Sequence, residues 1–142
     1  MRIRGFFELG APYIAGLIKC PDLDLAVPLR LLIDTGASRT VISDKDAVKL
    51  GLDYAKLEKL ESGLIGIGGE VETYALNRVS LLFRSNGGVH EEEIDIMVLR
   101  HQKMNGRVRN IPSLLGRDIL NKYALSMSAK KNFVEIKEDL SL

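Results

Sequence analysis

The sequence predicts a mainly β protein, folded as a closed antiparallel β-barrel with two short helices. Apolar runs of strand length recur along the chain, and turn residues separate them. Only two segments carry the signals of a helix, and both are short. The length of 142 residues and the lack of an internal repeat predict a single domain over residues 1–142.

The first third of the chain predicts two strands that lead to a charged turn. Residues 13–19 form an apolar run, and Pro21-Asp22 marks a turn after it. Residues 27–33 form a second run, whose Leu and Ile content predicts burial on both faces. This run ends at Asp34-Thr35-Gly36. A carboxylate at the end of a buried strand is an unusual place for a charge, so Asp34 is a candidate functional residue.

A short helix and a glycine-rich hairpin are predicted next. Ser43 is placed to cap a helix, Asp46 to complete a capping box, and Gly51 to end the helix. Residues 63–69 then hold four glycines among bulky aliphatic residues. Because no helical stripe flanks this segment, we expect a long hairpin with a glycine-rich tip.

The second half predicts two strand pairs and the other helix. Residues 76–83 and 89–99 are strands joined by a turn at 85–88. A polar, basic loop covers residues 100–110, and a short helix is expected over 117–123. The last two strands are predicted near 125–128 and 133–137.

Composition narrows the possible partners and locations. The net charge of +1 argues against nucleic acid as the main ligand. Cys20, the only cysteine, is expected to be a small buried residue rather than a reactive thiol. Neither a secretory leader nor a membrane span is expected, which makes a cytoplasmic location the default. No metal or other cofactor is predicted, so His90 and His101 are assigned to the surface, and the carboxylates of residues 91–95 to a solvated strand.

Three motifs occur in a fixed order: Leu32-Ile33-Asp34-Thr35-Gly36-Ala37-Ser38, the glycine hairpin, and Leu114-Leu115-Gly116-Arg117-Asp118. In this order they resemble the retropepsin-like aspartic peptidases, the group that includes retroviral proteases. The resemblance spans roughly residues 12–137 and implies a barrel of the acid-protease type. Because the chain carries one Asp-Thr-Gly, the resemblance also implies a homodimer in which two Asp34 carboxylates meet.

The resemblance implies a role for each motif residue in cleaving a peptide or protein substrate. Asp34 supplies half of the dyad that activates water, Thr35 holds the two loops in register, and Gly36 lets them approach closely. The hairpin is the flap, with the backbone N–H of Ile67 at its tip. The expected substrate-binding residues are Ala37, Leu64, Ile65, Gly66, Ile67 and Gly68, and the expected supports are Leu115, Gly116, Arg117 and Asp118. Together with Ile42, the flap aliphatics predict apolar subsites.

The sequence departs from the family pattern at three places. Ser38 stands where retroviral enzymes commonly have an aspartate that pairs with the arginine matching Arg117, so the partner of Arg117 is open. Ile65 occupies a flap position that is often glycine, and the loop over 100–110 has no clear counterpart. A non-catalytic, dimeric peptide-binding module on the same fold is the alternative function. For the basic loop, a solvated segment is favoured over an anion-binding patch.

Overall fold

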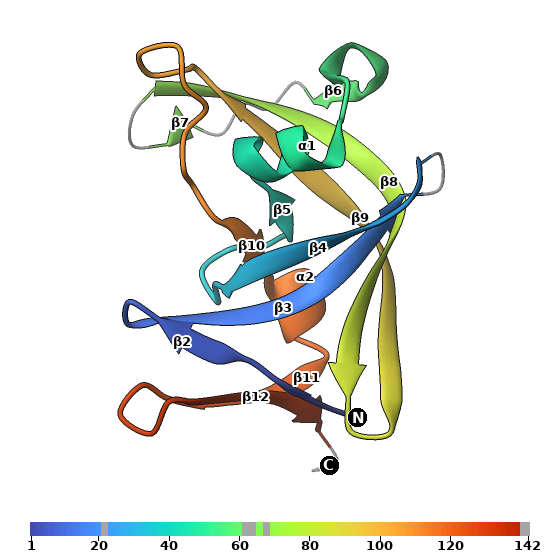
Figure 1. Cartoon of the computed structure of the whole chain (residues 1–142), viewed down its shortest axis with the longest axis vertical. Coiled ribbons are helices and arrows are strands. Elements are labelled where there is room, and N and C mark those ends of the chain that lie inside the picture. Colours follow the sequence, from blue (N-terminus) through green and yellow to red (C-terminus); the bar gives the residue numbers. More distant parts are fainter. Residues whose placement is uncertain (21–22, 61–64, 67–68, 140–142) are drawn as a thin grey trace.

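The protein is described by a computed structural model that covers residues 1–20, 23–60, 65–66 and 69–139. Six strands form a closed barrel in the order β3, β4, β10, β5, β9 and β8, and β8 pairs back with β3 (Figure 1). Most pairings are antiparallel, while β10 runs parallel to β4 and β5 runs parallel to β9. The predicted mainly β barrel is therefore confirmed.

The barrel strands are β3 (Ala11–Cys20), β4 (Leu23–Ile33), β5 (Val41–Ile42), β8 (Gly69–Ser85), β9 (Gly88–His101) and β10 (Ser113–Leu115). The strands β2 (Phe6–Glu8), β6 (Glu58–Leu60) and β7 (Ile65–Gly66) extend its edges. A separate sheet has the order β1 (Arg2–Arg4), β12 (Phe133–Glu138) and β11 (Tyr123–Ser128). The helices are α1 (Asp44–Leu50), the 3-10 turn η1 (Tyr54–Lys56) and α2 (Arg117–Leu120).

The predicted strands are confirmed, and most are longer than predicted. The strands β1 and β2 are too short to leave a pattern in the sequence and were not predicted. The helix expected over 117–123 ends at Leu120, because Tyr123 already pairs with Glu138 as the first residue of β11. The turn expected at Pro21-Asp22 lies outside the described residues.

The barrel interior is aliphatic and is filled from alternate positions of its strands. In β4, Leu29, Leu31 and Ile33 are buried, whereas Arg30 is exposed. Burial of this strand on both faces was therefore a wrong prediction, since only one face of β4 meets the core. Because successive side chains alternate, Asp34 continues the outward face that carries Arg30 and Leu32. Fully buried core residues include Ile14, Ile18, Leu31, Ile42, Leu81, Ile96, Val98 and Leu115.

The helix α1 begins and ends at the predicted residues but is not capped as predicted. Gly51 ends it in the left-handed conformation at φ 68°, as expected. The Ser43 side chain makes no capping hydrogen bond, so the capping box was a wrong prediction. Instead, the buried Ser113 hydroxyl donates to Asp46 Oδ2 at 2.5 Å and accepts from Ser43 N at 2.9 Å. The first turn of α1 is thus fixed to β10 rather than capped locally.

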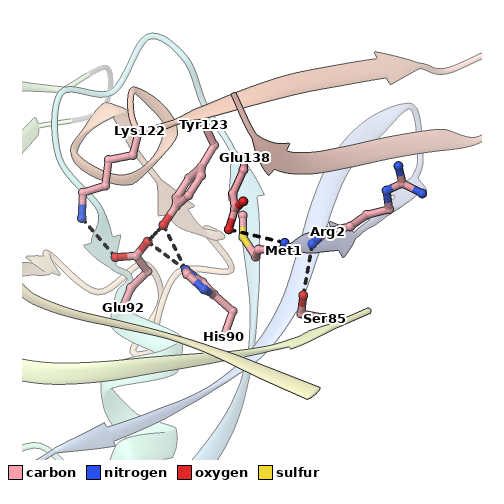
Figure 2. Close-up of polar contacts among 8 residues, drawn as sticks. All are labelled: Met1, Arg2, Ser85, His90, Glu92, Lys122, Tyr123 and Glu138. Atoms are coloured by element: carbon pink, nitrogen blue, oxygen red, sulfur yellow. Dashed lines mark hydrogen bonds and ion pairs between the residues drawn. The ribbon is translucent and has the colours of Figure 1, made fainter. Parts of the chain in front are cut away.

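A buried carboxylate joins β9 to the segment after α2. Glu92 is 6% exposed, and Figure 2 shows it surrounded by His90, Lys122 and Tyr123. Lys122 Nζ lies 3.0 Å from Glu92 Oε2, while the Tyr123 hydroxyl donates to Glu92 Oε1. His90 Nε2 lies 3.0 Å from Glu92 Oε1 and from the Tyr123 hydroxyl. The predictions of a solvated Glu92 and a surface His90 were therefore wrong.

Burial and hydrogen bonding in this cluster shift the pKa values of Glu92 and Tyr123. Burial raises the pKa of Glu92, but hydrogen bonds from Tyr123, His90 and Lys122 outweigh it and leave the pKa below its ordinary 4.5. Burial, followed by the hydrogen bond to Glu92, raises the pKa of Tyr123. A lowered carboxyl pKa means that the charged form favours folding, so this contribution is present above pH 4.5 and is lost as the pH falls through the folded-state pKa.

We expect Glu92→Gln to lower the free energy of unfolding by about 1–3 kcal/mol at neutral pH, because it removes the charge that three neighbours solvate. The difference from wild type should shrink as the pH falls below 4.5, where Glu92 itself becomes protonated. Chemical unfolding of both proteins between about pH 7 and pH 3 measures this, with the exposed Glu93→Gln as control. A constant difference across that range would contradict the assignment.

Candidate active site

The Asp-Thr-Gly motif forms a short turn in the connection between β4 and β5 (Figure 1). Asp34 is half-buried, and Thr35 and Gly36 are exposed. Gly36 N donates to Asp34 Oδ1 at 2.9 Å, and Ala37 N donates to the Asp34 carbonyl at 3.2 Å. The first bond holds the Asp34 carboxylate against its own loop, the second closes the turn, and the side chain stays partly exposed.

Gly36 leaves room for the Asp34 carboxylate. Its φ is not among the left-handed values found in the described residues. A Cβ at this position would lie 3.1 Å from Asp34 Oδ1. A side chain at residue 36 would therefore crowd the carboxylate that its N–H holds.

The segment that forms β10 and α2 lies directly beneath this loop. The parallel pairing of β10 with β4 continues past the end of the strand, since Asp34 N donates to the Leu115 carbonyl at 3.1 Å. Leu115 is 1% exposed and belongs to the core. A Cβ on Gly116 would lie 2.4 Å from the carbonyl carbon of Arg39, so only glycine allows the two backbones to pass here. The predicted support role of Leu115 and Gly116 thus has a geometric basis.

Arg117 binds the active-site loop through main-chain groups. Its backbone N donates to the Ala37 carbonyl at 2.8 Å, and its Nη1 donates to the Thr35 carbonyl at 2.9 Å. The partner of the Arg117 side chain, which could not be assigned from the sequence, is thus the Thr35 carbonyl. Among the described residues, no hydrogen bond or ion pair involves the Ser38 side chain, and no ion pair involves Asp34.

Asp118 holds the far end of the loop through Thr40. Asp118 Oδ2 accepts from Thr40 N at 2.9 Å, and Asp118 Oδ1 accepts from the Thr40 hydroxyl at 2.7 Å. The Thr40 hydroxyl oxygen in turn accepts from Gly116 N at 3.1 Å. Thr40 is fully buried, and sequence reasoning missed it. Its hydrogen-bond partner Asp118 is 78 residues away in the sequence. The only local sign that Thr40 is buried is its position before the apolar pair Val41-Ile42.

The predicted substrate-binding residues are only partly described. The β7 strand pairs with the start of β8 through Ile65↔Glu70 and Gly66↔Gly69, as the hairpin prediction requires. Leu64, Ile67 and Gly68 lie outside the described residues. Ala37 is half-buried beside Asp34. Ile42 is fully buried in the barrel core, so its prediction as a lining residue of a subsite was wrong.

The described residues hold neither a converging metal-binding set nor a membrane-crossing helix. No group of three or more His, Cys, Asp or Glu side chains in that part of the chain is placed to bind a metal ion. None of its helices has both the length and the apolar character that crossing a bilayer requires.

A closed β-barrel with an Asp-Thr-Gly turn seated on a Leu-Gly-Arg-Asp segment defines a protein of the acid-protease class. Residues 23–119 match the sequence profile of the family described as Aspartyl protease. The chain therefore belongs to this family, as one of its retropepsin-like aspartic peptidases.

Proteins similar to this chain include viral and bacterial ones. It is 31% identical over 119 residues to the Pol polyproteins of equine infectious anemia virus strain Wyoming and isolate 1369, a match that covers 78% of this chain and 9% of theirs. A retropepsin-like aspartic protease from Rickettsia conorii has a similar fold, with a TM-score of 0.57 and 22% identity over 96% of this chain and 88% of that one. The EIAV protease in complex with the inhibitor HBY-793 gives a TM-score of 0.50 and 25% identity, covering 81% and 90%.

We expect Thr40→Val to lower the free energy of unfolding by about 1–3 kcal/mol, because it leaves the buried Gly116 N–H and an Asp118 oxygen without their partner. Thr40→Ser keeps the hydroxyl and should lose less than half as much. Urea unfolding of the three proteins provides the comparison. Equal losses in the two variants would mean that packing of the threonine methyl group, and not its hydroxyl, holds the loop.

Proposed function

We propose that this protein is an aspartic endopeptidase that works as a homodimer with one Asp34 from each subunit. The observation that carries the proposal is the position of Asp34: a surface carboxylate on a turn whose backbone is hydrogen-bonded on both sides to residues 115–118. Such fixing limits the motion of the carboxylate and suits a catalytic group. A single copy of the motif supplies one carboxylate, so the dyad needs a second subunit.

The proposed chemistry uses the two carboxylates in different protonation states. As is general for aspartic proteases, carboxylates about 3 Å apart share one proton, since a second negative charge there is costly. The ionised Asp34 takes a proton from a bound water, whose oxygen attacks the scissile carbonyl carbon. The protonated Asp34 donates to the carbonyl oxygen as it becomes tetrahedral. Collapse of that intermediate breaks the C–N bond: the leaving nitrogen takes the proton that the base removed from water, and a hydroxyl of the intermediate returns a proton to the other Asp34.

In this proposal, the hairpin that begins at β7 is the flap that covers the bound peptide. Its antiparallel pairing with the start of β8 supports that role, because a two-stranded ribbon pivots as a unit. Closure over the peptide would exclude water other than the attacking one. The aliphatic residues of the hairpin favour substrates with apolar side chains beside the cleaved bond.

Asp34→Asn should abolish cleavage, with a loss of kcat/KM of at least about a thousandfold, because a neutral amide cannot act as the base. Purified wild type and variant are incubated with a diverse peptide pool from acidic to neutral pH. Mass spectrometry detects new termini, and gel filtration of both proteins reports the dimer. Cleavage by the wild-type dimer alone supports the proposal.

Two other outcomes have separate meanings. If both proteins dimerise and bind peptides but neither cleaves, the fold serves as a non-catalytic peptide-binding module, which is the alternative function. If the variant cleaves as well as wild type, the activity does not come from Asp34 and the proposed mechanism is wrong.

A further inference from the structure

Positive charge is concentrated in one segment of a chain that is otherwise balanced. Between Asp95 and Asp118 the sequence has no acidic residue, while the whole chain carries a net charge of +1. The same segment contains five basic residues besides His101, namely Arg100, Lys103, Arg107, Arg109 and Arg117. All of these except Arg117 lie in the loop over residues 100–110, which we call the basic loop. A local excess of this kind attracts negative charge even where the net charge is small.

The basic loop connects the base of the hairpin to the floor of the Asp34 loop. At one end, His101 pairs with Val71 of β8, the strand that continues from the hairpin. At the other end, the chain enters β10, whose Leu115 carbonyl accepts from Asp34 N. Figure 1 shows the loop at the same end of the molecule as β7 and descending to β10. A peptide bound between hairpin and Asp34 would therefore lie along this loop.

Several contacts fix the basic loop in place. Asp44 of α1 accepts from His101 N at 2.6 Å through Oδ2, and its Oδ1 lies 2.7 Å from His101 Nδ1. The side chain of His101 is 14% exposed, so its prediction as a surface residue was wrong. At the tip, Met104 and Arg107 form a β-bridge. A loop anchored at its base and tip presents its charges at defined positions, which lowers the entropic cost of binding.

A hollow of about 800 Å³ lies between the basic loop, α1 and β8. Its apolar surface includes Val48, which is 64% exposed, and Val108, which is 37% exposed. The Arg100 guanidinium lies 4.9 Å above the ring of Tyr54. Burial, followed by the charge of Asp44, raises the pKa of Tyr54 to about 12, so its hydroxyl stays neutral and donates to the Leu99 carbonyl at 3.0 Å. The other lining residues are Asp44, Glu72, His101, Gln102 and Lys103.

The carboxylates of the hollow are already engaged, whereas Lys103 and the neighbouring Arg107 form no ion pair among the described residues. Asp44 holds His101 with both oxygens. Glu72 accepts from the Tyr74 hydroxyl at 2.6 Å and lies 3.9 Å from Lys59 Nζ. The hollow and its rim thus combine exposed apolar surface with unneutralised positive charge.

We propose that the basic loop and this hollow form an exosite for an acidic segment of the polypeptide substrate, away from the bond that is cleaved. The inference rests on the proposed peptidase function for calling the bound peptide a substrate. Carboxylates of the segment pair with Lys103 and Arg107, and an apolar side chain packs against Val48 and Val108. The subsites beside the scissile bond stay apolar, and the acidic preference lies farther along the peptide.

An acidic peptide fits these observations better than a nucleic acid does. Single-stranded nucleic acid is bound by aromatic rings that stack on bases within a basic groove. Here Tyr54 is the aromatic residue of the hollow, and the Arg100 guanidinium already covers its ring. Exposed aliphatic surface beside cations suits Leu or Ile side chains next to Glu or Asp.

The test measures binding with the Asp34→Asn protein, so that no substrate is consumed. Two short fluorescent peptides are compared by anisotropy at low and high salt, one with alternating Glu and Leu and one with Gln in place of every Glu. We expect the Glu peptide to bind at least about tenfold more tightly than the Gln peptide at low salt, and this advantage to fall at high salt. Lys103→Glu combined with Arg107→Glu should remove most of the advantage.

The matched control reverses two exposed charges elsewhere. Lys130→Glu combined with Lys131→Glu changes the net charge equally in the turn between β11 and β12, and should alter binding less than about twofold. Thermal unfolding verifies that each variant folds. Equal binding of both peptides, or equal losses in the two charge-reversed proteins, would overturn the exosite. So would displacement of the Glu peptide by single-stranded DNA at lower concentration than by unlabelled Glu peptide.

Together, the binding and cleavage measurements distinguish a failure of the exosite from a failure of the proposed peptidase function. If wild type cleaves nothing but the Glu peptide binds as expected, the proposed peptidase function fails and the acidic-peptide site remains. If wild type cleaves peptides and the Lys103 and Arg107 variant shows an unchanged KM for a substrate with a distal acidic segment, the exosite fails and the peptidase function remains.

Discussion

The active-site loop depends on one parallel pairing, that of β10 with β4. This pairing places Leu115 and Gly116 under the backbone of Asp34, and from there Arg117 and Asp118 reach the rest of the turn. The loop's own residues contribute only the short bonds from Gly36 N and Ala37 N to Asp34. Since the supporting segment is about 80 residues away in sequence, Asp34 takes this position only where β10 is paired with β4. The site is thus a product of the whole fold.

The same pairing explains why small and polar residues occur beneath the loop. Gly116 is needed because the Arg39 carbonyl carbon would lie 2.4 Å from a Cβ. The close approach would bury the Gly116 N–H without a partner, and the Thr40 hydroxyl accepts from it. That hydroxyl donates in turn to Asp118, whose other oxygen accepts from Thr40 N. One connected set of residues therefore both allows the close approach of the two backbones and supplies the hydrogen bonds that this approach requires.

Local features were predicted well from the sequence, and long-range pairings were not. The β8–β9 hairpin and the end of α1 at Gly51 follow from turn residues and alternation, which act between near neighbours. Thr40, His101 and Glu92 have partners 78, 57 and about 30 residues away, and no local pattern marks them as buried. Arg117 shows the limit of family resemblance, because its side chain binds the Thr35 carbonyl in place of the missing aspartate.

The burial of β4 shows a second limit. Its many Leu and Ile residues predicted burial on both faces, yet Arg30 is exposed and only alternate residues enter the core. A count of apolar residues does not distinguish a strand in a barrel wall from one between two layers of helices. The outcome matters for Asp34, since alternation puts its side chain on the outward face, where it is available at the surface.

The distribution of cations around the site suits the carboxylate dyad of the proposed mechanism. A guanidinium or ammonium next to Asp34 would favour its charged form and oppose the shared proton on which the proposed mechanism depends. The nearest arginine in the supporting segment, Arg117, instead gives its Nη1 to the Thr35 carbonyl. Lys103 and Arg107 lie in the basic loop, where β9 leaves the barrel, rather than in the Asp34 turn. Under the proposals above, attraction of an acidic substrate and protonation of the dyad are then governed by different residues, so the basic loop can change in charge without altering the catalytic chemistry.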